Sequence, residues 1–225
     1  VADAQKIQLA KTTPEKEAYL KRVLANMGAV NKGLPCGVHV SLSIDDRVVN
    51  MIWEKYQSRL NSKEAVRNHL YILLAQGFLR YRWLLTYLLG ASPVAERKFF
   101  NPGDPQPDHP VRSLRQRHYG FDMRFAGDYT NVRRYVNRVL AGVKKKEIID
   151  VAQFHGAIRL KSQGSFEEME ERGVNYIELR MLDLDPWSMA GIRLNTLYFL
   201  RIMASYFIMT PGLDEEACLL YTSDA

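Results

Sequence analysis

A long apolar segment constrains the fold of this chain more than any other feature of its sequence. Residues 70–89 form its most apolar stretch, and their length is about that of a membrane-spanning helix. Arg80 and Arg82 lie in the middle of the stretch, where a charge within lipid would be costly. The segment therefore predicts a buried or amphipathic helix of a soluble protein, with no membrane partner.

The composition agrees with a soluble globular domain and limits its partners. The chain has 225 residues, of which 47% are hydrophobic and 25% charged, so it can bury one sizeable core. A net charge of +6 suits anionic small molecules such as nucleotides as well as nucleic acid. The densest basic block is only residues 144–146, which argues against a nucleic-acid partner. The oligomeric state stays open.

The two ends of the sequence need separate treatment. The chain begins with Val1, and no secretory signal follows it. Residues 218–225, CLLYTSDA, fit an in-frame translation of TGTCTCTTATACACATCTGACGC, which is typical of a transposon sequencing adapter, so we expect them to be foreign. Cys36 is then the only cysteine, which predicts no internal disulfide and suits the reducing cytoplasm.

Strict alternation of apolar and polar residues predicts a strand over residues 37–44, with the valines and other apolar residues on one face and His39 on the other. Two further strands are expected over residues 151–161 and 176–184. Helices are expected over residues 15–27, 47–60, 62–90, 131–143 and 193–209. Because no regular βαβ period appears, the pattern favours an α+β domain with long helices and a mixed or antiparallel sheet.

Five short segments carry a resemblance to a known family, and they occur in that family's order. They are GVHVSLSI (37–44), FLRYRWLLTYLLGASPV (78–94), VRSLRQRHYGF (111–121), HGAIRLK (155–161) and YIELRMLDLDPWSMAGI (176–192). Together they resemble the bacterial glutamate–cysteine ligases, including the ligase half of the bifunctional glutathione synthetases. The last segment is the most specific of the five.

The resemblance implies a glutamine synthetase-like catalytic fold and a two-step reaction. ATP would phosphorylate the γ-carboxyl of glutamate, and the amine of cysteine would attack the γ-glutamyl phosphate, which is the first step of glutathione biosynthesis. The implied cofactor is Mg²⁺ or Mn²⁺, with ATP as co-substrate. Residues 1–217 would be an internal fragment of one catalytic domain. The family's first strands, which supply most metal-binding carboxylates, would lie upstream, so the fragment alone should be inactive.

The segment 176–184 supplies the two residues on which this function depends most. Glu178 and Arg180 are two positions apart on a predicted strand and so share a face. A carboxylate can hold Mg²⁺, and a guanidinium can neutralise charge on a transferred phosphoryl group. With the resemblance, Glu178 is predicted to bind metal and Arg180 to be catalytic. From the residues alone, a solvated surface ion pair explains the same pattern.

Other candidate residues come from the remaining segments. The resemblance places His39 in the substrate and nucleotide pocket, with a role at the nucleotide-bound metal, although a lone strand histidine is more often structural. Arg115 matches an arginine of the family's substrate loop and is suited to grip a carboxylate bidentately. Arg159 and Lys161 share a strand face and are candidates to meet ATP phosphates, or simply a solvated face. We expect His39, Arg115, Glu178 and Arg180 to converge on one polar cleft.

The sequence also departs from the family pattern. Phe121 and His155 stand where the family usually has tyrosines, which changes the hydrogen-bond groups near the substrate. Asp183 is expected to be structural and to cap the turn at residues 186–191. The open alternatives are a non-catalytic member of the same fold, a helix-rich binding module, or a carboxylate–amine ligase with another amine substrate.

Overall fold

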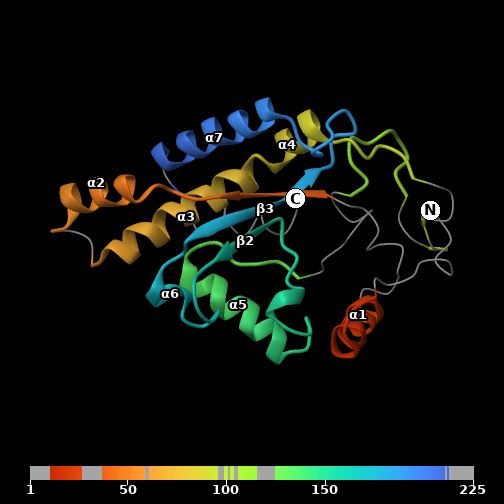
Figure 1. Ribbon diagram of the computed structural model, residues 1–225, viewed down its shortest axis with the longest axis horizontal. Coiled ribbons are helices and arrows are strands. Elements are labelled where there is room, and N and C mark those ends of the chain that lie inside the picture. Colours follow the sequence, from red (N-terminus) through yellow and green to blue (C-terminus); the bar gives the residue numbers. More distant parts are fainter. Residues whose placement is uncertain are drawn as a thin grey trace.

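A small antiparallel sheet flanked by helices makes up the fold (Figure 1). The computed structural model describes residues 11–26, 37–58, 61–95, 99–100, 102–103, 106–115, 125–210 and 212. The strands β1 (Gly37–Leu42), β2 (Ile158–Lys161) and β3 (Tyr176–Asp183) lie in the order β1-β3-β2. Both pairings are antiparallel, so the α+β prediction is confirmed.

The helices carry most of the remaining described residues. They are α1 (Pro14–Asn26), α2 (Asp46–Tyr56), α3 (Lys63–Arg80), α4 (Arg82–Leu89), α5 (Val132–Lys144), α6 (Met169–Arg172) and α7 (Leu194–Met209), with a 3₁₀ turn, η5 (Val151–Gln153). Asp45, Ser62 and Asn131 cap α2, α3 and α5, because each side chain accepts a backbone N–H of the first helical turn. These caps explain why the three helices begin where they do.

The apolar helix α3 lies at the centre of the core. Tyr71, Leu74, Ala75 and Phe78 are all buried on it. The helix packs against β3 and β2 on one side and against α7 on another (Figure 1). Within the part of the chain that the structure describes, no helix combines the length and apolarity that crossing a bilayer would need.

Most boundaries differ from the sequence-based prediction by only a few residues, but two expected elements differ in kind. The single helix expected over residues 62–90 is two helices, because Tyr81 has φ −99° and ψ 15°, which interrupts the helical geometry between α3 and α4. The strand expected over residues 151–161 begins only at Ile158. The preceding residues turn instead, because Asp150 caps η5 by accepting the N–H of Gln153 at 2.9 Å.

Candidate active site

The sheet has one apolar face and one polar face, as its alternating sequences require. On the apolar face Val40, Leu179 and Ile158 lie side by side across the three strands and are buried. On the polar face Glu178 pairs in register with Arg159 of β2 and with a serine, Ser41, of β1. The candidate site residues of the two outer strands therefore meet at the central strand.

Glu178 stands at the centre of a contact cluster on the polar face. Its Oε1 lies 3.2 Å from Nδ1 of His39, and its Oε2 accepts a hydrogen bond from Nη1 of Arg180 at 3.1 Å. Nη1 of Arg180 lies 3.5 Å from the same His39 nitrogen. The structure therefore brings three of the predicted site residues into direct contact, and each of these side chains keeps some exposure to solvent.

A register shift in the sheet sets Arg180 beside His39. Between the same two pairs of partners, β1 has one residue, His39, whereas β3 has two, Arg180 and Met181. Such a β-bulge bends the strand and re-aims its side chains, and bulges are frequent next to active sites. The N–H of Arg180 still donates to the carbonyl of Ala157 at 2.8 Å, which ties the bulge to the segment before β2.

Burial and neighbouring cations set the protonation of the cluster. Burial acts to raise the pKa of Glu178, but the Arg180 guanidinium, with Lys161 and His39, outweighs it and lowers the pKa. Burial and then the Arg180 charge lower the pKa of His39, against the opposing effect of Glu178. At neutral pH the cluster therefore holds an ionised carboxylate beside a neutral imidazole, whose Nδ1–H can donate to Glu178.

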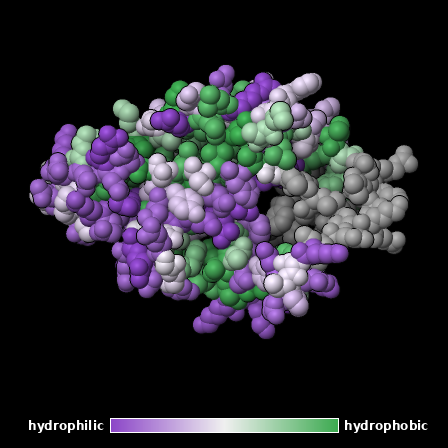
Figure 2. Space-filling view, viewed as in Figure 1, coloured by the Kyte–Doolittle hydropathy of each residue, from purple (hydrophilic) through white to green (hydrophobic). Residues whose placement is uncertain are grey.

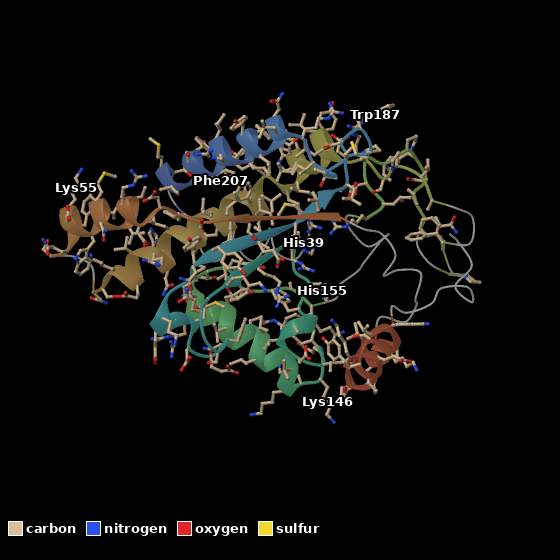
Figure 3. The ribbon with its side chains drawn as sticks, viewed as in Figure 1. His39, Lys55, Lys146, His155, Trp187 and Phe207 are labelled. Atoms are coloured by element: carbon tan, nitrogen blue, oxygen red, sulfur yellow. The ribbon has the colours of Figure 1, made fainter. Side chains whose placement is uncertain are left out.

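Further cations and a second histidine surround this cluster. Lys161 shares the strand face of Arg159, and burial together with the Arg159 charge lowers the pKa of Lys161. His155 lies near His39 (Figure 3), and burial lowers its pKa too, although its Nδ1 bonds to the carbonyl of Gln153. With Arg180, the face carries three fixed cations around one carboxylate, so it attracts anions.

The side chain of Arg115 contacts the backbone of β3. Nη2 donates to the carbonyl of Arg180 at 2.6 Å, and Nη1 donates to the carbonyl of Leu182 at 3.3 Å. The first carbonyl belongs to the bulge and the second to the residue after it, so the guanidinium holds the bulged strand in shape. The guanidinium also lies against Gly37, where a side chain would collide with it. A grip on a substrate carboxylate, as the sequence predicts, would need other N–H groups of the same side chain.

Asp183 is buried and structural, but the turn that it was expected to cap has another cap. Its Oδ2 accepts from the backbone N–H of Ala91 at 2.9 Å and from the hydroxyl of Ser92 at 2.8 Å. The turn at residues 186–191 is capped by Asp185, whose Oδ1 accepts the N–H of Trp187 at 2.9 Å. The prediction of the capping residue was wrong because the Asp183 carboxylate bonds to the loop after α4, and Asp185 lies closer to the turn.

Two sequence-based predictions fall outside the described residues: the substrate contact of Phe121 and the foreign origin of residues 218–225. Conversely, sequence reasoning gave no role to Ser41 or Gly37. The alternation over residues 37–44 already placed Ser41 on the polar face, which was the available signal. Nothing in the sequence indicated that Gly37 makes room for Arg115.

The metal-binding capacity of this face is partial. Glu178 offers a carboxylate and His39 an imidazole, and the described residues contain no group of three or more histidine, cysteine or acidic side chains placed to hold one ion. Mg²⁺ favours near-octahedral oxygen coordination shared with phosphates. The pair therefore supplies only part of such an octahedral ligand set.

A carboxylate–arginine pair among extra cations on a sheet attracts anionic groups such as phosphates. Comparison with known proteins gives the protein family. The family model for glutamate–cysteine ligase matches residues 1–149 and 128–219, and the chain belongs to this family.

Relatives and solved structures agree with this assignment. The chain is 31% identical over 222 residues to the glutathione biosynthesis bifunctional protein of Enterococcus faecalis, covering 98% of the chain and 29% of that protein. It is 35% identical over 197 residues to the corresponding Lactiplantibacillus plantarum protein, covering 87% of the chain and 25% of that protein. The chain thus spans less than a third of the length of these relatives.

Two crystal structures share its fold. A bifunctional glutathione synthetase from Pasteurella multocida superimposes with a TM-score of 0.84 at 29% identity, covering 96% of this chain and 29% of that one. A glutamate–cysteine ligase from Francisella tularensis in complex with AMP superimposes with a TM-score of 0.77 at 22% identity, covering 98% of this chain and 53% of that one.

Proposed function

We propose that residues 1–217 are an internal part of the catalytic domain of an ATP-dependent ligase that joins the γ-carboxyl of glutamate to the amine of cysteine. The observation that carries this proposal is the contact cluster of His39, Glu178 and Arg180 on the polar face of the sheet. It occurs in a chain of the glutamate–cysteine ligase family. The AMP bound to the Francisella tularensis relative supports a nucleotide as co-substrate.

The cations of the polar face are assigned to the phosphates of ATP. Arg159 lies in register with Glu178, and Lys161 lies two residues further along the same strand. A guanidinium and an ammonium can each pair with phosphate oxygens, the first bidentately. The lowered pKa of Lys161 reflects burial and the nearby Arg159 charge, and an incoming phosphate would relieve that repulsion.

Glu178 and His39 are assigned to hold the nucleotide-bound Mg²⁺ or Mn²⁺, which would neutralise negative charge on the phosphates. Glu178 is suited to this because its pKa is lowered and it stays ionised at neutral pH. His39 orients the carboxylate through Nδ1. The remaining ligands would come from the strands that precede this part in the intact ligase.

The reaction balances without any further reagent. A γ-carboxylate oxygen of glutamate attacks the γ-phosphorus of ATP, the bond to the bridging oxygen breaks, and ADP leaves. The cysteine amine then attacks the acyl carbon, phosphate leaves, and the amine loses a proton. Arg180 is held by Glu178 at 3.1 Å and is assigned to the charge that develops on the transferred phosphoryl group. We place the reaction in the cytoplasm, because the lone Cys36 of residues 1–217 suits a reducing compartment.

A ligase with another amine acceptor is the second candidate. His155 favours it, because an imidazole with a lowered pKa stands where the family usually has a tyrosine. Competition among amines for the same acyl phosphate separates the two candidates. If cysteine gives the highest kcat/KM of a panel of amino acids, the first candidate holds.

The direct test measures ADP release that depends on both glutamate and cysteine. We expect the intact ligase to turn over, the present chain alone to be inactive, and Glu178→Gln in the intact ligase to lose about 10²-fold or more, as for a strong electrostatic contact in a transition state. Glu147→Gln is the matched control, because Glu147 pairs with Arg138 at 2.7 Å on the surface. Robust turnover by the chain alone, or equal turnover by the two mutants, would count against the assignment.

A further inference from the structure

Helix α7 has two apolar faces, and the structure covers only one of them. On the inner face Leu200, Met203 and Phe207 are buried. Phe207 stacks on Tyr81 at 5.5 Å between ring centroids and meets Phe78 edge-on at 5.0 Å, so this face is packed on α3 and the start of α4. A helix that is apolar all round is typical of a buried position rather than a surface.

The outer face of α7 presents large apolar side chains to solvent. They are Leu194, Tyr198, Ile202, Tyr206 and Met209, which we call the outer stripe. Their spacing of three or four residues places them in one row along the helix. Ile202, at the centre of the row, is 68% exposed. Within Leu194–Met209 the only charged residue is Arg201, so the stripe has little to favour contact with water.

The exposed apolar surface continues from α7 onto α4. Trp83 and Tyr87 are each 63% exposed. A cavity of about 670 Å³ lies between the end of α4 and the start of α7, and Leu88 and Thr196 both line it. In the upper part of Figure 2, where Figure 1 has α7 and α4, green apolar groups lie among hydrophilic ones. Exposed groups of large apolar side chains mark interfaces, and aromatic residues are enriched at such surfaces.

The composition of the surface favours protein over lipid as its partner. A helix that lies on a membrane has basic residues along its polar face and apolar residues on the other. In α7 the face opposite the outer stripe is itself apolar and packed on α3, and Arg201 is the single cation. The structure therefore resembles a core layer without its outer cover.

We propose that the outer stripe with Trp83 and Tyr87 is an internal interface of the ligase, covered by an amphipathic helix from polypeptide beyond this chain. The proposal rests on the reading of the chain as part of a longer protein. The Enterococcus faecalis relative is more than three times longer than the part matched here, since that part is 29% of its length. A helix with apolar residues at every third or fourth position would interdigitate with the outer stripe.

The test compares the chemical accessibility of the stripe in two proteins. Ile202→Cys is made in this chain and in the intact product of its gene, each with Cys36 and Cys218 replaced by serine where present. We expect a maleimide to label residue 202 rapidly in the chain and at least 100-fold more slowly in the intact protein. Tyr56→Cys, on an exposed aromatic position of α2, is the matched control and should label equally in both. Tyr198→Cys repeats the measurement if the first variant fails to fold.

The other occupants are separated by the same reagents. Equal labelling in the two proteins would overturn the proposal. Protection that appears in the chain alone and rises with its concentration would assign the surface to a second copy. Protection of the chain by anionic phospholipid vesicles would assign it to lipid. None of these measurements depends on catalysis. The proposal about the interface and the proposal about the reaction can therefore be refuted independently.

Discussion

Gly37 lies so close to Arg115 that a Cβ at residue 37 would stand 2.3 Å from Cζ of the guanidinium and 2.5 Å from the carbonyl oxygen of Leu182. Only a residue without a side chain lets Arg115 reach the carbonyls of Arg180 and Leu182. The absence of a side chain at residue 37 therefore lets Arg115 hold the bulge of β3. The bulge in turn sets the direction of the Arg180 side chain.

Gly37→Ala should lower the free energy of unfolding by about 1–3 kcal/mol, because it overpacks a closed site. Urea denaturation of the chain measures this. In an Arg115→Ala background the same change should cost less, since only the Leu182 carbonyl then opposes the new methyl group. An equal cost in both backgrounds would mean that Gly37 and Arg115 are not coupled.

A second prediction concerns the hydroxyl of Tyr71, which joins α3 to two distant segments. It accepts the N–H of Ile44 at 2.9 Å and donates to the carbonyl of Asn175. Tyr71→Phe leaves both backbone groups without this partner, so unfolding should become easier by about 1–3 kcal/mol. Tyr87→Phe is the control, because Tyr87 is exposed and its hydroxyl can bond to water. A loss no larger than that of the control would contradict the bridging role.

The strands were predictable to the extent that local periodicity determines them. The alternation of residues 37–44 gave both the strand and its polar face, and the spacing of Glu178 and Arg180 put them on one side of the sheet. The pairing of β1 with β3 could not be read from periodicity, because it joins residues about 140 positions apart, such as Ser41 and Glu178.

Other features depended on tertiary contacts that cannot be recognised in a short stretch of sequence. The break at Tyr81 lies inside a continuous apolar pattern, and there the ring stacks on Phe207. The carboxylate of Asp183 bonds instead to Ala91 and Ser92, which are distant in the sequence. Both errors arose because tertiary packing overrode a regular local pattern.

The third prediction is a pH dependence of stability. Burial lowers the pKa of His155, so the folded chain takes up a proton there less readily than the unfolded chain. The contribution of neutral His155 is therefore fully present above its ordinary pKa of about 6.5 and is lost as the pH falls below that value. Urea denaturation at about pH 7.5 and about pH 5.5 should show a smaller loss for His155→Gln than for the unmodified chain.

His109→Gln serves as the control for this measurement, because His109 is 71% exposed. The comparison therefore sets a buried histidine against an exposed one. If His155→Gln and His109→Gln lose the same stability between the two pH values, then His155 does not resist protonation in the fold. His39→Gln would then be the next variant, since burial and Arg180 lower the pKa of His39 as well.

The last prediction concerns Arg180 in the intact ligase. Its guanidinium bonds to Glu178 through Nη1 at 3.1 Å and so has further N–H groups with which to meet a phosphoryl oxygen. Lysine has one compact ammonium and cannot span both positions in the same planar geometry. We therefore expect Arg180→Lys to lower kcat by about 10²-fold while the KM for glutamate changes much less, because the lost contact acts mainly in the transition state. Arg133→Lys is the matched control, since Arg133 pairs with Glu170 at 2.9 Å with its side chain 72% exposed and should tolerate the change. Steady-state ADP release gives kcat and KM, and urea denaturation of both mutants shows whether the fold is intact. Near-normal kcat in Arg180→Lys with the fold preserved would leave Arg180 as a structural partner of Glu178 and would remove it from the chemistry.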